Sequence, residues 1–310
     1  MCTSEILDEL KKGSQNYYDK GKELAINTKC TFKIINEDIK KEFIERNTLN
    51  FQNEAGIIDY NTPIYRIFPL DRLLETLKDK QFCLVKPEAW DDPYENSVLN
   101  SKGITKNNRE VSLKPIAERY YGQCWSLKEE CDGLWRNYTR KSCEKCNFDE
   151  FKKNHGKPPI SAKVKTTVGK LMDAFYDESN KFHSICYYIG KVKYVEYDDI
   201  KEVAKNALEV ATCQDNSLQI MTLLMKRKPF EYEQEVRLIY CKTDDDNFGD
   251  LFKFDIDPNN LIDEIILDPW IETEQRDSTI QQIKKYYTGN VDVSKLYRKE
   301  DFVFEIDEEF

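Results

Sequence analysis

The sequence predicts an α+β protein, because short apolar segments typical of strands are separated by helical segments of mixed length. The 310 residues include 18 Tyr and 16 Phe, and 40% of the chain is apolar, which allows a substantial core. Glycine occurs only 11 times, and nothing resembles the glycine-rich phosphate loops GxGxxG or GxxxxGKS. These observations favour α+β over a doubly wound parallel sheet.

Residues 1–60 are predicted to form a helical N-terminal extension, and residues 61–310 a single α+β domain of catalytic type. Apolar residues at helical spacing predict one or two helices over residues 4–28. A further helix is predicted over residues 36–48, where Asn36 or Asp38 can cap its first turn. No motif with a chemical function is visible in this part of the chain.

The larger segment is predicted from alternating and helical apolar patterns. In chain order the predicted elements are a strand at 64–70, a helix at 70–80, strands at 82–85 and 121–126, a helix at 134–138, a strand at 163–168, a helix at 169–179, two strands within 183–195, helices at 199–212 and 217–227, strands at 226–240, 251–256 and 261–267, a helix at 277–287, and a last strand within 297–310.

The stretch KRKPFEYEQEVRLIY at residues 226–240 is the most informative of these. Read as one strand, it places Glu231, Glu233, Glu235 and Arg237 on the face opposite an apolar face. Such a face is ordinary where water covers it, with Arg237 pairing with Glu235, and chemically active where it lines a cleft. The sequence alone leaves both interpretations open.

Charge and cysteine content limit the class of protein. With 47 basic and 57 acidic residues the net charge is −10, which disfavours generic attachment to nucleic acid or to an anionic membrane. No apolar run reaches the ~20 residues of a membrane span, and the chain does not open with a signal peptide. The ten cysteines are therefore expected to be free thiols, and the cytoplasm is the expected compartment.

A zinc site is the one metal centre that the spacing suggests. Cys143 and Cys146 form a CxxC pair, with Cys131 upstream and His155 downstream as further candidates. A second paired element is missing, and one CxxC is unsurprising in a chain with ten cysteines, so zinc is disfavoured. No metal is predicted at the functional site.

Three segments, in the same order, resemble an uncharacterised bacterial family, the domain of unknown function twenty-nine seventy-one. The segments are IYRIFPLDRLLETLKDKQFCLVKPEAWDDPYEN, CWSLKEECDGLWRNYT, and KPFEYEQEVRLIY followed by FDIDPNNLIDEIIL. The resemblance spans roughly residues 60–270. It implies no function by itself.

The same segments are similar to the catalytic skeleton of ADP-ribosyltransferases. That superfamily is marked by a strand carrying Arg or His, a second strand ending in an aromatic-Ser or Ser-Thr-Ser element, and a late strand opening with Glu-x-Glu or Gln-x-Glu. Arg66 stands at the first position, Ser126 at the second, and Glu233 and Glu235 at the third. The Ser-Thr-Ser element is reduced here to Trp-Ser-Leu. The resemblance implies split mixed and antiparallel sheets with flanking helices.

This resemblance implies NAD as the substrate. Cleavage of the nicotinamide–ribose bond passes through an oxocarbenium-like state that a carboxylate stabilises. Glu235 would hold a ribose hydroxyl, Glu233 would polarise the acceptor, Arg66 would meet the diphosphate or ribose, and Ser126 would orient Glu235 or the nicotinamide side. Tyr65 or Tyr138 would stack on nicotinamide. ADP-ribose would pass to a protein, nucleic acid or small-molecule acceptor, or to water, in a bacterial toxin or phage-defence effector.

Two alternatives stay open. One is a non-catalytic module of the same fold that binds a nucleotide or a partner. The other is a metal-dependent nuclease built from Asp91, Asp92, Glu233 and Glu235, because oxygen ligands suit Mg²⁺. Separately, Arg66 could form a structural ion pair with Asp91 or Glu235, which is compatible with either function. The transferase requires Arg66, Ser126 and Glu235 to converge on one cleft, whereas the nuclease requires three carboxylates around one point.

Overall fold

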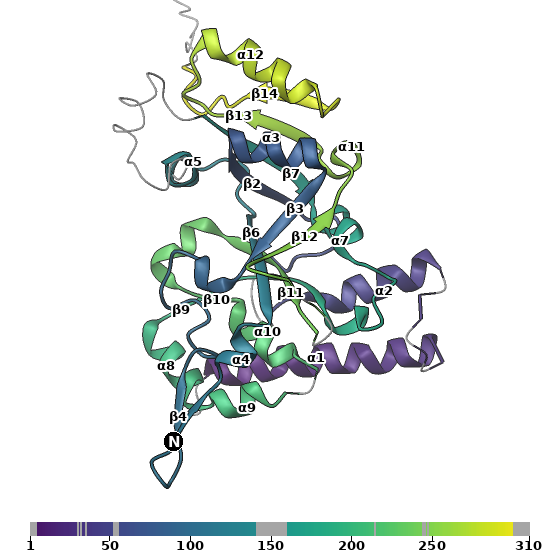
Figure 1. Cartoon of the computed structure of the whole chain (residues 1–310), viewed down its shortest axis with the longest axis vertical. Helices are drawn as coiled ribbons and strands as arrows, with labels where there is room; N and C mark the ends of the chain where they lie inside the picture. Colours follow the sequence, from purple (N-terminus) through teal and green to yellow (C-terminus); the bar gives the residue numbers. More distant parts are fainter. Residues whose placement is uncertain are drawn as a thin grey trace, which may run out of the picture.

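The computed structural model describes residues 5–29, 31, 33–34, 36–51, 56–140, 160–213, 215–243, 246 and 248–299 (Figure 1). Within these residues, ten strands form one sheet, with neighbours in the order β1-β8-β11-β6-β2-β7-β13-β14 and a branch of β3 and β12 that joins at β6. Most neighbours are antiparallel, and the β1–β8 and β13–β14 pairs are parallel. The predicted α+β class with a mixed sheet and flanking helices is confirmed.

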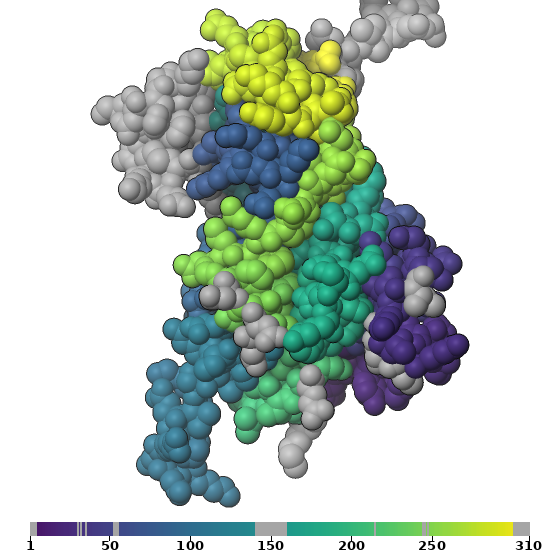
Figure 2. Space-filling model, turned by 45° about the vertical axis from the view of Figure 1, so that its right-hand side comes forward, coloured from purple at the N-terminus to yellow at the C-terminus, as the bar shows by residue number. Residues whose placement is uncertain are grey.

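The strands of the sheet follow the apolar alternation of the sequence. They are β1 (Thr48–Leu49), β2 (Pro63–Pro69), β3 (Gln81–Val85), β6 (Tyr120–Ser126), β7 (Ser161–Thr167), β8 (Tyr187–Lys191), β11 (Glu235–Cys241), β12 (Leu251–Asp255), β13 (Glu264–Leu267) and β14 (Asn290–Val293). Separate from this sheet, β9 (Lys193–Val195) pairs with β10 (Met225–Arg227), and β4 (Lys102–Ile104) pairs with β5 (Glu110–Ser112) in a hairpin that protrudes from the molecule (Figures 1 and 2).

The sheet divides at β6. On one side β6 pairs along its whole length with β11. On the other side it meets β2 only through Tyr65 and Ser126, and β3 only through Val85 and Gly122. The β2–β7–β13–β14 branch and the β3–β12 branch therefore separate beside β6, and side chains of both branches border the space between them.

The helices cover the sheet through their apolar faces. They are α1 (Glu5–Asn27), α2 (Glu37–Asn47), α3 (Leu70–Asp79), α4 (Lys114–Ala117), α5 (Asp132–Arg140), α7 (Val168–Phe175), α8 (Tyr197–Lys205), α9 (Ala207–Ala211), α10 (Ser217–Leu223), α11 (Pro258–Leu261) and α12 (Thr273–Lys284), with 3₁₀ turns η1 (Pro87–Ala89), η2 (His183–Ile185) and η3 (Lys228–Glu233). Asn36 caps α2 by accepting from the Ile39 N–H, as predicted. Figure 2 shows α12, in yellow, lying over α3, in blue.

The first helices pack directly on the rest of the chain. Ile6, Leu10 and Tyr17 of α1 are buried in a core that α8 and α10 also line, and β1 extends the main sheet through β8. Helices are thus present where the sequence predicted them. The division into an extension at 1–60 and a domain at 61–310 stays a prediction.

The prediction of one continuous strand at 226–240 is wrong. The chain forms β10 as far as Arg227, turns through η3, and begins β11 only at Glu235. Pro229 has no N–H for a strand ladder, and Gln234 adopts a left-handed conformation with φ of 43° that interrupts extended backbone. Similarly, the helix predicted at 217–227 ends at Leu223, and the strand predicted at 261–267 begins at Glu264.

Most of the predicted last strand at 297–310 lies outside the described residues. No helix in the described part of the chain is long and apolar enough to cross a membrane.

Candidate functional site

The three motif strands are neighbours in the sheet. Tyr65 on β2 pairs with Ser126 on β6, and Ser126 pairs on its other side with Glu235 on β11. Arg66 follows Tyr65, and Glu233 precedes Glu235 by two residues. Residues separated by up to 170 positions in the sequence are thus aligned across three adjacent strands, at the place where the sheet divides.

Cavities open on both sides of Arg66. One of about 430 Å³ is lined by Arg66, Tyr138, Glu233 and Glu235 together with η1 and β10 residues. A second, of about 550 Å³, lies toward α3 and β3 and shares Arg66 and Tyr138 with the first. Both volumes fall in the range of small-molecule sites. A third cavity of only about 20 Å³ is lined by all six predicted site residues, Tyr65, Arg66, Ser126, Tyr138, Glu233 and Glu235.

Glu235 is held by two buried cations. Its Oε1 lies 2.8 Å from the Lys226 ammonium, and its Oε2 lies 2.7 Å from Nη2 of Arg237 and accepts from Nε of the same guanidinium. Its main-chain N–H donates to the Tyr194 hydroxyl. Burial opposes ionisation, but the charges of Arg237 and Lys226 outweigh it and lower the pKa of Glu235 to about 2. Glu235 is therefore an ionised carboxylate at neutral pH.

Glu233 has the opposite character. Its Oε2 lies 2.6 Å from the Lys226 ammonium, which also contacts the neighbouring Glu235 carboxylate. Burial and this neighbouring carboxylate raise the pKa of Glu233 to about 7, although Lys226 opposes the shift. Two carboxylates with separated pKa values, both lining one cavity, are the arrangement that suits one group to electrostatic stabilisation and the other to proton transfer.

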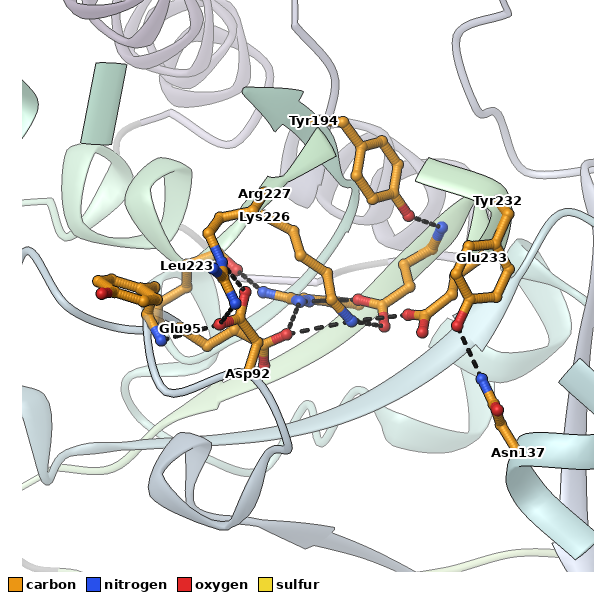
Figure 3. Close-up of polar contacts among 12 residues, drawn as sticks. Asp92, Glu95, Asn137, Tyr194, Leu223, Lys226, Arg227, Tyr232 and Glu233 are labelled. Carbon is orange, nitrogen blue, oxygen red and sulfur yellow. Dashed lines mark hydrogen bonds and ion pairs between the residues drawn. The ribbon is translucent and has the colours of Figure 1, made fainter. Parts of the chain in front are cut away.

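Lys226 and Glu95 complete a buried network of charges (Figure 3). Glu95 Oε1 lies 3.1 Å from both the Lys226 ammonium and Nη2 of Arg237. Its Oε2 is buried with no hydrogen-bond partner, and burial raises the pKa of this carboxyl. Because Glu95 lines the 430 Å³ cavity, the unpaired oxygen is a candidate acceptor for a ligand hydroxyl or amide.

Arg66 is a half-buried cation without an ionic partner among the described residues. Its Nη1 donates to the Cys124 carbonyl, and its Nε has no hydrogen-bond partner. Burial of the guanidinium lowers the pKa of Arg66, although weaker effects of nearby groups, Glu235 among them, oppose the shift. Among the described residues, Arg66 makes no ion pair with Asp91 or Glu235, the structural partners that the sequence left open for it. A guanidinium that is buried, under-bonded and bordered by cavities is suited to an anion such as a phosphate.

Ser126 supports the turn that carries Glu233. Its hydroxyl donates to the Glu233 main-chain carbonyl at 2.6 Å and accepts from the Lys128 N–H at 3.0 Å. The Leu127 N–H donates to the Gln234 carbonyl, which lies just before the first residue of β11. Ser126 thus fixes the backbone between the two glutamates, and the described contacts of its hydroxyl do not include the Glu235 carboxylate that it was predicted to orient. That role stays a prediction.

The two stacking candidates occupy different places. Tyr138, on α5, borders all three cavities, so it lies beside any ligand that passes Arg66. Tyr65 is buried and lines only the smallest cavity, with the Lys163 ammonium 5.6 Å from its ring centroid. Tyr138 is therefore the better placed of the two for contact with a planar ring.

Sequence reasoning missed Lys226 and Trp90. Lys226 directly follows the apolar run Leu223–Met225, and this position was the available signal, but Lys226 also opens the basic run KRK, which is typical of exposed chain. Trp90 lies with its ring centroid 4.3 Å from the Arg237 guanidinium and lines the 430 Å³ cavity. The sequence offered an Arg237–Glu235 pair and a cleft-lining Glu235 as alternatives. In the structure Glu235 pairs with Arg237 and also lines the 430 Å³ cavity.

Two metal sites were considered from the sequence, a zinc site and a carboxylate site for Mg²⁺. Cys143, Cys146 and His155 lie outside the described residues, and Cys131 is a half-buried free thiol at the smallest cavity. In the part of the chain that the structure describes, no group of three or more His, Cys, Asp or Glu side chains could hold a metal ion. Three carboxylates do converge, but on the Lys226 ammonium, and Asp92 instead pairs with Arg227 at 2.8 Å. The nuclease alternative gains no support from this arrangement.

Comparison with known proteins yields a limited likeness. No family model matches the chain, so the resemblance to the domain of unknown function stays a prediction, and no curated protein matches it. Among solved structures, the chain is similar to DarT of Thermus sp. 2.9 in complex with NAD+, with 12% identity and a TM-score of 0.34 over 77% of this chain and 98% of that chain. The same protein in complex with ADP-ribosylated ssDNA gives 11% identity and a TM-score of 0.34 over 77% and 96%. A likeness at this level carries no argument about the site.

Proposed function

We propose that the chain binds NAD at the divided sheet and cleaves its nicotinamide–ribose bond, transferring ADP-ribose to an acceptor or to water. The proposal is supported above all by one observation. Arg66 is half-buried, its Nε is buried with no hydrogen-bond partner, and it borders the same cavity as Glu233 and Glu235. An anion site beside a pair of carboxylates matches a substrate with a diphosphate next to a ribose.

Each of the site residues has one role in the proposed reaction. When the nicotinamide–ribose bond breaks, its electron pair leaves with nicotinamide, and positive charge spreads over the ribose C1 and ring oxygen. Glu235, ionised at neutral pH, stabilises that charge and accepts from a ribose hydroxyl. Glu233, whose pKa is raised to about 7, takes the proton of the attacking hydroxyl or amine. Arg66 holds the diphosphate.

Two supporting groups fit the same pose. Ser126 keeps the turn between the glutamates in place through the Glu233 carbonyl. Tyr138 borders the cavities on both sides of Arg66 and is placed to contact the nicotinamide ring. Consumption of NAD or modification of a cellular target by such a site is the activity that a bacterial toxin or phage-defence effector would need.

The decisive experiment follows nicotinamide release from labelled NAD by the wild type and by Glu235→Gln. The substitution removes a charge that is needed only as the transition state forms, so turnover should fall by about 10²–10³-fold. Glu231→Gln is the matched control, because Glu231 is an exposed glutamate of the same turn. Equal turnover in the wild type and Glu235→Gln would rule out the role assigned to Glu235.

A second candidate is a non-catalytic NAD- or nucleotide-binding module of the same fold. It is favoured by the near-complete burial of the Glu235 side chain, which is 4% exposed, and by the engagement of both its oxygens with cations. In that case calorimetry would show NAD binding by the wild type without nicotinamide release, and Glu235→Gln would retain the affinity.

A further inference from the structure

Lys226 occupies an unusual position for a lysine. It lies on the short strand β10, paired in register with Tyr194 of β9, and its side chain is only 8% exposed. Lysine is rarely buried unless its ammonium is paired. Here the ammonium meets three carboxylates, from Glu95, Glu233 and Glu235, at 3.1, 2.6 and 2.8 Å.

The network holds more carboxylates than cations. Lys226 and Arg237 supply two positive charges against the three carboxylates of Glu95, Glu233 and Glu235. Arg237 contacts Glu95 and Glu235 but makes no ion pair with Glu233 among the described contacts, so Lys226 is the cation that Glu233 and Glu235 share. One proton on the network would balance its charges, and the carboxylate with the least cationic support is the natural place for it.

Stability alone gives little reason to keep such a cluster. Buried ion pairs can often be replaced by apolar side chains at no cost in stability, because desolvation offsets the attraction between the charges. The cluster is also not sealed in the core, since Lys226, Glu95, Glu233 and Glu235 all line the 430 Å³ cavity. A role at the cavity explains both features.

We propose that Lys226 is a positioning residue, whose ammonium holds Glu233 and Glu235 side by side so that Glu235 remains a free carboxylate and Glu233 can give up its proton and serve as a base. This inference rests on the proposed function for its catalytic meaning. On binding, a ribose hydroxyl shares Glu235 with Lys226, and the acceptor passes its proton to the ionised form of Glu233, which the same ammonium keeps adjacent. Lys226 makes no contact with the reacting atoms in this arrangement.

Other ionisable groups near the two glutamates also influence the ionisation of Glu233 and Glu235. They come from the elements packed around the pair and are Arg66, Glu95, Cys124, Tyr138, Tyr194, Tyr232 and Arg237. Burial raises the pKa of each tyrosine, so these phenols stay neutral across the physiological range. Removal of Lys226 therefore changes the one charge that both Glu233 and Glu235 contact.

The test compares Lys226→Met, Lys226→Arg and the control Lys228→Met by the pH dependence of nicotinamide release. Lys228 is two residues away, exposed, and paired with Glu196 at 2.8 Å. Lys226→Met should lower kcat at pH 7 by about tenfold or more and move the midpoint of the profile up by ~1–3 pH units, with KM for NAD little changed. Lys226→Arg should keep the midpoint near that of the wild type. A loss of activity with an unmoved midpoint would overturn the proposal.

A second readout needs no turnover. In protein carrying ¹³C-labelled glutamate, one side-chain carboxyl resonance should titrate near neutral pH. That resonance should be absent in Glu233→Gln, and the midpoint of its titration should lie at higher pH in Lys226→Met. Absence of such a titration in the wild type, or an unmoved one in folded Lys226→Met, would overturn the role of Lys226. If the resonance moves as expected but the wild type releases no nicotinamide, the positioning role holds and the proposed function fails.

Discussion

The Ser126 hydroxyl donates to the main-chain carbonyl of Glu233, although Ser126 is paired in the sheet with Glu235. The serine therefore acts on the backbone that separates the two glutamates. Gln234, between them, adopts a left-handed conformation, and its carbonyl accepts from Leu127. Glu233 is thus the last residue of a 3₁₀ turn and Glu235 the first residue of a strand, and both carboxylates contact the Lys226 ammonium.

Replacement of Arg66 by methionine should separate binding from stability. The variant loses the guanidinium that we assign to the diphosphate, and a charge-assisted hydrogen bond contributes ~1.5–3 kcal/mol, so the Kd for NAD should rise about 10- to 150-fold. Because Arg66 lacks an ionic partner among the described residues, its removal should leave Tm unchanged or raised. Calorimetric titration and thermal melts measure the two effects.

Arg276→Met is the matched control for that variant, since Arg276 is exposed on α12 and pairs with Asp277. It should change neither quantity. A fall in Tm of Arg66→Met together with unchanged NAD affinity would show that Arg66 is structural.

Glu233 should make stability fall as pH rises through neutrality. Its pKa is raised from 4.5 to about 7 in the folded chain, so between these values the folded state holds a proton that the unfolded state has released. The stabilisation is complete below pH 4.5 and is lost as pH rises through 7, and its size is on the order of 3 kcal/mol. Urea unfolding from pH 5 to 8 should therefore show Glu233→Gln gaining stability relative to the wild type. Parallel curves for the two proteins would refute the raised pKa.

Arg237 should be required for folding far more than an exposed arginine. It is fully buried and pairs with Glu95 and Glu235, so Arg237→Met leaves two carboxylates with less compensation and should cost ~3–5 kcal/mol of unfolding free energy. Arg72→Met breaks an exposed pair with Glu75 and should cost less than ~1 kcal/mol. Urea denaturation at pH 7 compares them. Similar small losses in both variants would contradict the importance of the buried network.

The sequence predicted the parts of the site that depend on order and periodicity. Strands carrying Arg66 and Ser126 follow from apolar alternation, and both lie where it placed them. The left-handed Gln234 was not predictable from periodicity, because alternation through residues 230–240 fits an uninterrupted strand equally well. Nor was the meeting of Lys226 with Glu95, since the β9–β10 pair and the loop after η1 are brought together only by tertiary packing. The alternation of apolar residues predicts which side chains share a face of a strand. Tertiary packing determines which charged side chains contact one another.

Gly122 should be required for the shape of the 430 Å³ cavity. A Cβ at this position would lie 2.4 Å from Cζ2 of Trp90, which lines the cavity, and the strands β3 and β11 flank it in the sheet. Gly122→Ala therefore forces the indole to move toward the cavity, which should weaken NAD binding and cost ~1–3 kcal/mol of stability. Gly249→Ala is the control, because no atom lies within 4 Å of its added Cβ, and it should change stability by less than ~0.5 kcal/mol. Tryptophan fluorescence, urea unfolding and NAD titration of the two variants make the comparison. Unchanged NAD affinity in a folded Gly122→Ala protein would place the ligand outside this cavity.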